Sequence, residues 1–535
     1  MGSSDGRVRS RWIAAAAGGV AVVFAAPFVY LVGRNLREPA TAWAELTSGD
    51  AWGPLARSVL LAVLVSVSAT VVGAGAAWLV ARTDVPGARA WRVLLPLPLV
   101  MPSFIGAFVF VAALAPGGLL EAVLRPFGAG RLPGIGGLGG SFLVLTLFTY
   151  PYVYLPARAR FRRLAPSLEE SARLLGRGSW STFWRVVVPQ ARGAILAGTL
   201  LVFLYTVSEF GVVQLMRYDT LTRSIYATRF LDPARSFALS LQLGLLAVAV
   251  VVAERAFARG GAVPRESQRD HRAMTLALGR WRAAALAFLT ALVGTALVLP
   301  VGVLAWWAAR GAARGATSAS GGFGDVAGLG RSILNTSFVS LAAALTAVVA
   351  VLPVAYLIVR RKGLAAAAAN AVVVGGFALP GLAIALSLVA FSVDAPGPLA
   401  ALYQTIPLLV LAYVVHFGAP ALRTAQVAIA GIPQRVEDAA RTLGASRFDR
   451  LRRVELPMML PGLLAGAGLV LLSSMKELPA TLLLAPAGFQ TLAMKVWTAT
   501  ESAFFADASL AALVLVALSG VLTWLLVIRR GDVLV

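Results

Sequence analysis

Two glutamates lie inside long apolar stretches of this chain, and they are the residues best placed to do chemistry. They are Glu209 and Glu477, and Lys476 directly precedes the second of them. Ionisable groups are costly inside a hydrocarbon layer, so they usually indicate a function there. One hypothesis is that both carboxylates line a transport pathway, as an acidic constriction that a passing cation meets. Two alternatives remain open: each carboxylate makes an interhelical hydrogen bond, or Lys476 neutralises Glu477.

Several other kinds of reactive site are excluded by residues that the sequence lacks. The chain has no cysteine, which rules out disulfides and thiolate metal sites. A phosphate-binding loop needs a lysine directly after a glycine, and none of Lys362, Lys476 and Lys495 follows one. We therefore assign no catalytic residue, no metal site and no cofactor to this chain. Its energy must come from a partner ATPase or from an ion gradient.

The composition indicates a membrane protein. Of 535 residues, 59% are hydrophobic and 13% charged, and the mean hydropathy is +0.81. A helix needs about 20 apolar residues to cross ~30 Å of hydrocarbon, and twelve stretches approach that length. They lie near 13–32, 58–80, 93–114, 141–156, 194–215, 237–253, 283–305, 332–358, 366–392, 404–422, 462–485 and 508–527. The fourth is short and contains Pro151 and Pro156, and His416, near the cytoplasmic end of the tenth, is interpreted as structural.

The basic residues follow the pattern of an inner-membrane protein. The formal net charge is +23, and most of the 47 Lys and Arg fall in alternate loops, those that face the cytoplasm if both termini do. They are scattered between apolar runs rather than gathered along one face, which argues against a nucleic-acid partner. We expect a multi-pass protein of the cell inner membrane, in contact with lipid, with its N and C termini in the cytoplasm.

One polar segment occurs twice in the chain. Residues 169–190 read EESARLLGRGSWSTFWRVVVPQ, and residues 437–458 read EDAARTLGASRFDRLRRVELPM. The identical pairs are Glu169/Glu437, Ala172/Ala440, Arg173/Arg441, Leu175/Leu443, Gly176/Gly444, Arg185/Arg453, Val186/Val454 and Pro189/Pro457. The offset of 268 residues is half the chain length, so the whole chain is expected to consist of two tandem halves.

Each half contains six predicted spans, so both halves enter the bilayer in the same orientation. We expect an all-α polytopic fold with a pseudo-two-fold axis along the membrane normal and a pathway between the halves. The predicted domains are 1–255 and 283–535, joined by a cytoplasmic linker at 256–282.

The repeated segments are punctuated in the same way. Residues 168–175 favour a helix, Gly176 interrupts it, a second short helix follows, and Pro189 marks the entry to the next span. Gly444 and Pro457 impose the same pattern on the second copy. A single copy would fit an amphipathic helix lying among lipid headgroups. Two copies at matched positions instead indicate a pair of levers, moved by a pair of identical partners.

The spacing of these residues resembles the EAA loop of permease subunits of binding-protein-dependent ABC importers, here at 168–189 and 436–457. In that family the loop forms a coupling helix seated in a groove of a cytoplasmic ATPase. The resemblance implies the type I importer transmembrane fold, with two copies of a partner ATPase that uses ATP and Mg²⁺. It makes Glu170 and Asp438 the acids that meet the ATPase. The further coupling residues it implies are Ala172, Gly176, Pro189, Ala440, Gly444 and Pro457.

Nearly the whole chain resembles the fused, two-half permeases of ferric iron importers. The stretches that carry this likeness include LPLPLVMPSFIGAF (95–108), LPGLAIALSL (379–388) and MKELPATLLL (475–484). The resemblance implies a periplasmic or lipid-anchored ferric iron-binding protein as a partner. Permeases for thiamine, sulfate or molybdate share parts of the pattern, and a secondary transporter driven by an ion gradient is a further alternative. The duplicated lever favours an ATP-driven importer.

Overall fold

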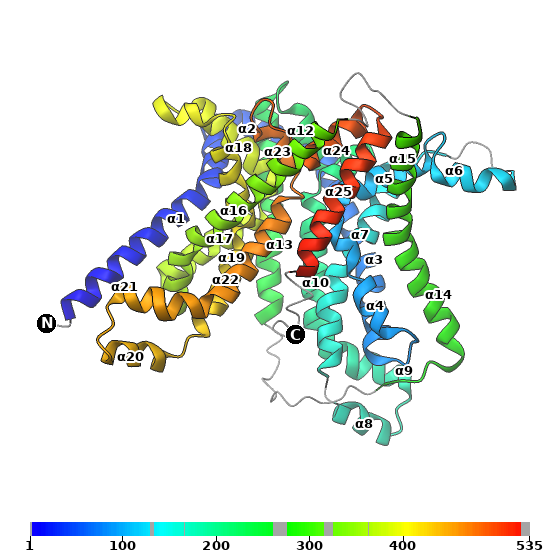
Figure 1. Cartoon of the computed structure of the whole chain (residues 1–535), viewed down its shortest axis with the longest axis horizontal. Helices are drawn as coiled ribbons and strands as arrows, with labels where there is room; N and C mark the ends of the chain where they lie inside the picture. Colours follow the sequence, from blue (N-terminus) through cyan, green and yellow to red (C-terminus); the bar gives the residue numbers. More distant parts are fainter. Residues whose placement is uncertain are drawn as a thin grey trace.

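The fold was analysed in a computed structural model, which describes residues 3–128, 133–164, 166–259, 275–314, 325–361 and 363–525. Within these residues the chain is helical, and the one β-bridge is an isolated contact between Thr83 and Leu276. Eleven helical segments are long and apolar enough to cross a membrane, and a bent helix pair makes a possible twelfth. Each overlaps one of the twelve predicted stretches, so the predicted polytopic all-α fold is confirmed (Figure 1). Three observed segments, Ser103–Phe127, Phe183–Ser208 and Phe448–Ser474, are offset from the predicted 93–114, 194–215 and 462–485.

Long helices build the two halves. Those of the first half are α1 (Ser3–Arg37), α3 (Gly49–Arg82), α5 (Ser103–Leu114), α7 (Gly137–Arg162), α10 (Val188–Ser208) and α13 (Pro233–Arg259). Those of the second are α14 (Arg282–Val293), α15 (Leu299–Arg314), α16 (Val326–Arg360), α17 (Leu364–Ala378), α18 (Gly381–Asp394), α19 (Ile406–Ala430), α22 (Leu456–Ser474) and α25 (Phe505–Thr523). The fourth span is longer than predicted, because α7 continues through Pro151 and Pro156. Neighbouring helices bury it on most sides, and such packing supports proline-containing spans.

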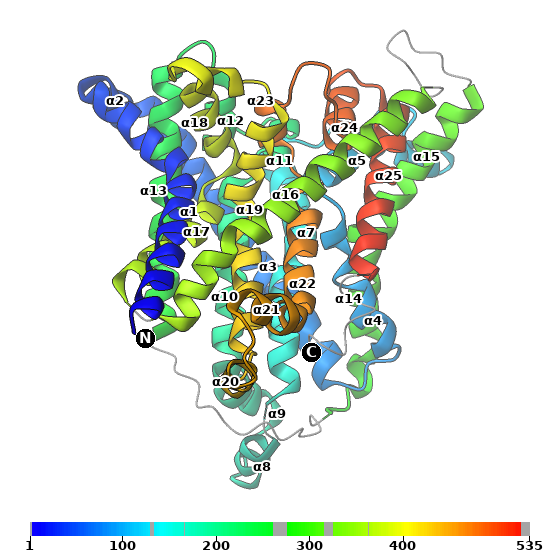
Figure 2. The same ribbon diagram turned by 60° about the vertical axis from the view of Figure 1, so that its left-hand side comes forward.

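Shorter helices connect these spans. They are α2 (Pro39–Thr47), α4 (Ala88–Leu94), α6 (Leu119–Leu124), α8 (Pro166–Leu174), α9 (Ser179–Thr182), α11 (Gly211–Leu215), α12 (Leu221–Thr228), α20 (Gln434–Thr442), α21 (Arg447–Arg450), α23 (Pro479–Leu484) and α24 (Leu492–Glu501). Helices α8 and α20 project from one end of the molecule, and α6, α18 and α24 lie at the other (Figures 1 and 2).

Corresponding helices pack in the same way in the two halves. Helices α3, α7 and α10 pack against one another, as do α16, α19 and α22. The first helix of each half contacts the other half: α1 lies mainly against α16 and α17, and α15 lies mainly against α25 of its own half but also against α5. Phe24 of α1 is buried in the hydrophobic core of the second half, where Gly418 leaves room for its ring. The halves are therefore interlocked.

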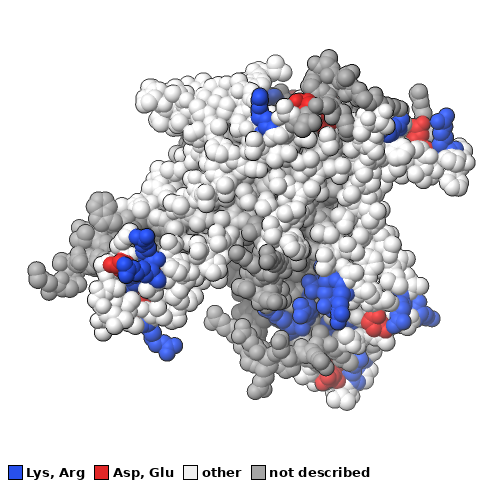
Figure 3. Space-filling model, in the orientation of Figure 1, with Lys and Arg blue, Asp and Glu red and all other residues white. Residues whose placement is uncertain are grey.

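Charged side chains are concentrated at the two ends of the molecule. On the face shown in Figure 3, Lys and Arg gather over the end that carries α8 and α20, with smaller groups at the opposite end. The surface between them is almost free of charge on this face, as a membrane-embedded band requires. Of the predicted linker 256–282, residues 260–274 lie outside the described part of the chain.

Candidate functional site

The two copies of the polar segment have the same backbone. We call residues 169–190 the first repeat segment and residues 437–458 the second. Each turns at a glycine in the left-handed region, with φ of +79° at Gly176 and +76° at Gly444. At each turn the glycine N–H donates to the carbonyl three residues earlier and the next N–H to the carbonyl five residues earlier, over 2.9–3.1 Å. This helix end favours glycine, because a Cβ is strained at positive φ.

The predicted coupling residues divide between a buried and an exposed face. Ala172 and Ala440 are 7% and 9% exposed, so their side chains are buried. Glu170 and Asp438 are exposed, and Asp438 makes a surface ion pair within its own helix, 3.6 Å from Arg441. Each segment therefore presents its acid outward while its alanine faces inward.

Two more features of the repeat are shared. Pro189 and Pro457 each stand at the second residue of α10 or α22, inside a helical segment that begins before it. A π-helical turn precedes each of these helices. Beside the glycines, Leu175 and Leu443 are 81% and 86% exposed. The end of the molecule that carries α8 and α20 thus displays two similar surfaces, each with an acid and a bare leucine.

The first repeat segment is held to its half by a buried ion pair that sequence reasoning missed. The Arg82 guanidinium, at the last residue of α3, contacts the Glu169 carboxylate, and both side chains are almost fully buried. Arg82 also donates to the Phe161 carbonyl at 3.4 Å. The identity of Glu169 and Glu437 in the repeat was the available signal, since neither is needed for the helix itself.

The second repeat segment has an equivalent but more open pair. Arg360, the last residue of α16, contacts Glu437, and their side chains are 33% and 16% exposed. Since α3 and α16 occupy corresponding places in the two halves, both repeat segments are tied to the same kind of helix.

The second segment has an additional buried polar network close to α22. Glu455 is 2% exposed and accepts hydrogen bonds from the Tyr356 hydroxyl at 2.7 Å and from Arg450 Nε at 2.6 Å. The first segment packs aromatic rings in the same region, with the centroids of Trp78 and Phe183 5.3 Å apart. Buried carboxylates require such partners, and here they come from α16 and α21.

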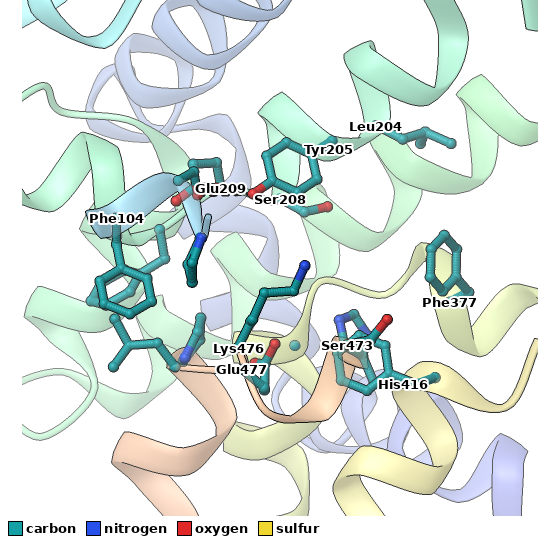
Figure 4. A pocket seen from close by; sticks show the side chains of 18 of the residues that line it. Phe104, Leu204, Tyr205, Ser208, Glu209, Phe377, His416, Ser473, Lys476 and Glu477 are labelled. Atoms are coloured by element: carbon teal, nitrogen blue, oxygen red, sulfur yellow. Dashed lines mark hydrogen bonds between the residues drawn. The ribbon is translucent and has the colours of Figure 1, made fainter. Parts of the chain in front are cut away.

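A cavity of about 360 Å³ lies between the two halves, halfway along the long helices. Glu209 and Glu477 line it, and so do Lys476 and His416 (Figure 4). Whether this cavity is the predicted substrate pathway stays a prediction. Four spans break beside it: after α10, after α22, between α4 and α5, and between α17 and α18, which bend by 104°. Non-helical backbone is tolerated at membrane depth where it lines a cavity, which explains why the breaks occur here.

Glu209 is held by several hydrogen bonds at the break between α10 and α11. Its carboxylate accepts from the Ser103 hydroxyl at 2.8 Å and from the Val212 N–H at 3.0 Å. Ser103, at the start of α5, in turn accepts from the Tyr205 hydroxyl at 2.8 Å. This carboxylate therefore makes the interhelical hydrogen bond considered from sequence while it also faces the cavity.

Glu477 lies at the corresponding break in the second half with fewer partners. Its carboxylate accepts from the Ala480 N–H at 3.1 Å. Gly381, at the start of α18, contributes no side chain; a Cβ there would lie 2.8 Å from a Glu477 oxygen and 3.5 Å from His416 Nε2. The Lys476 ammonium donates to the Leu99 carbonyl at 3.0 Å rather than pairing with Glu477 in the described structure.

His416 was placed wrongly from the sequence. Helix α19 continues to Ala430, so His416 lies near its middle and lines the cavity, not at the cytoplasmic end of the span. The apolar run ends near residue 422, which hid the last two turns of the helix. Among the described residues, no three His, Asp or Glu side chains come together as a metal-binding group. The cavity can offer a cation oxygen and nitrogen contacts but no closed metal site.

Comparisons with known proteins match both halves separately. Residues 69–260 and 352–529 match the family of binding-protein-dependent transport system inner membrane components. The chain is 30% identical over 506 residues to the Fe(3+)-transport system permease protein FbpB 2 of Haemophilus influenzae, covering 94% of both chains. The molybdenum transport system permease protein ModB of Azotobacter vinelandii is 34% identical over 153 residues, 29% of this chain and 67% of that protein.

A third relative matches a similar share of this chain. The sulfate transport system permease protein CysW of Synechocystis is 27% identical over 202 residues, 36% of this chain and 72% of its own. The family match includes both repeat segments and both cavity carboxylates. The chain therefore belongs to the family of binding-protein-dependent transport system inner membrane components, as a fused, two-half permease of an ABC importer.

Proposed function

We propose that this permease carries ferric iron across the bacterial inner membrane, delivered by a periplasmic or lipid-anchored solute-binding protein. The observation that supports iron best is the extent of the likeness: the iron permease relative matches both halves over 94% of the chain. The molybdenum and sulfate permeases match 29% and 36% of it. A two-half permease for thiamine, molybdate or sulfate is the alternative.

We propose that the repeat segments are where two copies of a partner ATPase bind. Glu170 and Asp438 are the exposed acids that meet its basic groups, and Leu175 and Leu443 supply bare apolar contacts beside them. Ala172, Ala440, Gly176, Gly444, Pro189 and Pro457 shape the segments rather than contact the nucleotide. In this proposal ATP and Mg²⁺ are held by the ATPase, and this chain holds no cofactor and performs no hydrolysis.

We infer an alternating-access mechanism from this arrangement. Loaded binding protein docks at the end that carries α6 and α24, ATP draws the two repeat segments together, and the halves rock so that the cavity opens outward. Glu209 and Glu477 then meet the cation as it passes, and hydrolysis resets the halves. Both termini lie on the cytoplasmic side in this orientation, with α8 and α20. A conduit should bind its cargo weakly, which suits two separate carboxylates better than a closed metal site.

The experiment that tests the class is co-purification of an ATPase with the tagged chain. Charge reversal of both acids, Glu170→Arg with Asp438→Arg, should abolish co-purification. Reversal of Glu38 and Glu45 changes the net charge equally at the other end of the molecule and serves as the control. Full-rate uptake in vesicles without any ATPase would contradict the proposal and favour an ion-gradient carrier.

The substrate is tested by uptake in cells that lack the chromosomal copy of the gene. Ferric iron, molybdate, sulfate and thiamine are offered separately as radiolabelled solutes. We expect chain-dependent uptake of iron alone. ATP-driven uptake of one of the other solutes would refute iron as the substrate but would still agree with an ABC importer.

A further inference from the structure

The C-terminal end of helix α3 contacts two segments that are distant from it in the sequence, one on each side. On one side, the buried Arg82 guanidinium pairs with Glu169 and donates to the Phe161 carbonyl. Glu169 is on α8, the first helix of the first repeat segment. Any displacement of α8 must therefore move α3 or break a buried ion pair, which is costly because it leaves a charge without a partner.

On the other side, the residues after α3 pair with the residues that lead into α14. The Leu276 N–H donates to the Arg82 carbonyl at 2.8 Å, and the Asp84 N–H donates to the Leu276 carbonyl at 3.1 Å. The Asp84 carboxylate accepts from the Leu278 N–H at 2.8 Å and from the Arg282 guanidinium at 2.6 Å. These donors, the Leu278 N–H first, hold the pKa of Asp84 below its usual value. Asp84 therefore stays ionised, as its ion pair requires.

The corresponding end of α16 is arranged differently. Its ion pair, Arg360 with Glu437, is partly exposed. The next N–H, of Arg361, donates back to the Leu357 carbonyl of its own helix at 3.0 Å. Among the residues described around this end, no backbone bridge joins it to a distant segment. The combination of a buried ion pair and a backbone bridge is therefore found at the end of α3, in the first half, and not at the described end of α16.

We propose that Arg82 and Asp84 are positioning residues that connect the first repeat segment to the first helix of the second half. When the first ATPase displaces α8, the displacement reaches α3 through Glu169 and α14 through residues 276–282. Helix α14 continues through a π-helical turn into α15, which packs on α5 and α25. One ATPase contact thus moves helices of both halves, a route that exists because the halves are fused.

This inference rests on the proposed ATPase contact, so its test measures coupling rather than assembly. The full-length chain is reconstituted in proteoliposomes with its co-purifying ATPase and ferric-loaded binding protein. Iron uptake and ATP hydrolysis are measured together. The variants are Asp84→Ala, at a half-buried position, and Arg282→Gln, at an exposed one. Arg280→Gln is the matched control, because Arg280 is an exposed arginine two residues from Arg282 and makes no contact with Asp84 in the described structure.

We expect both variants to retain the ATPase and its hydrolysis while iron uptake per ATP falls about fivefold or more, the usual size of a lost coupling between sites. The control should match the unaltered chain. In the Asp84→Ala background, Thr83→Cys with Leu276→Cys restores the bridge covalently. The chain has no other cysteine, so oxidation should restore uptake per ATP and reduction should remove it.

Three results would overturn the inference. The first is unchanged iron uptake per ATP in Asp84→Ala and Arg282→Gln. The second is an equal loss of uptake per ATP in the control Arg280→Gln. The third is a disulfide between residues 83 and 276 that forms without restoring uptake per ATP. Failure of the unaltered chain to bind an ATPase would instead refute the proposed function itself. A thermal unfolding curve for each variant separates loss of coupling from loss of folded protein.

Discussion

The two repeat segments share a backbone, and an ion pair ties the start of each to a corresponding helix, α3 or α16, but the burial of the two pairs differs. The first is fixed near its start, where Glu169 is buried with Arg82, and it ends in aromatic packing. The second has a partly exposed pair at its start and a buried polar network at its end, around Glu455. Identity between the copies is retained at the glycine turn, the exposed leucine, the buried alanine and the carboxylate of the ion pair, whereas the outward acid is Glu170 in one copy and Asp438 in the other.

The largest expected effect comes from removing the carboxylate at the start of each segment. Glu169→Ala leaves Arg82 buried and unpaired, which should cost about 3–5 kcal/mol. Glu437→Ala leaves Arg360 where water reaches it, and the loss should be about 0–1 kcal/mol. The check is the thermal unfolding midpoint of the two variants in the same detergent. Equal shifts would show that the two attachments are alike and that the comparison is wrong.

A second effect should be confined to the end of the second segment. Tyr356→Phe removes the hydroxyl that donates to the buried Glu455 at 2.7 Å, and a hydrogen bond to a charged group contributes about 1.5–3 kcal/mol. Tyr403→Phe is the control, since the Tyr403 ring is half-exposed in a connecting loop. Unfolding midpoints again provide the measurement. A shift in the control as large as that of Tyr356→Phe would assign the effect to the loss of any tyrosine hydroxyl.

Sequence alone was enough to locate the spans and the repeat segments. Apolar length predicts membrane helices, and the glycine and proline spacing predicts the turns of both segments. The breaks within the spans were not predictable, because residues such as Leu379 and Pro380 sit in apolar runs that look continuous. Their interruption depends on the cavity beside them.

The attachments of the repeat segments were also beyond sequence reasoning. Arg82 and Arg360 look like ordinary basic residues at the ends of spans, where the positive-inside pattern already explains them. Their carboxylate partners lie 87 and 77 residues further along the chain. Only the packing of α3 against α7, and of α16 against α19, brings each pair together.

A third effect, smaller than those of Glu169→Ala and Tyr356→Phe, should be the same in both segments. Gly176→Ala and Gly444→Ala each place a Cβ at positive φ, in open surroundings, and should cost about 1–2 kcal/mol through backbone strain alone. Gly178→Ala, a neighbouring glycine without positive φ, is the control. Because the turn faces outward in both copies, the two losses should be equal even though the attachments differ. Unequal losses would show that the difference between the halves extends into the surface proposed to meet the ATPase, so that the two ATPase copies would not meet equivalent sites.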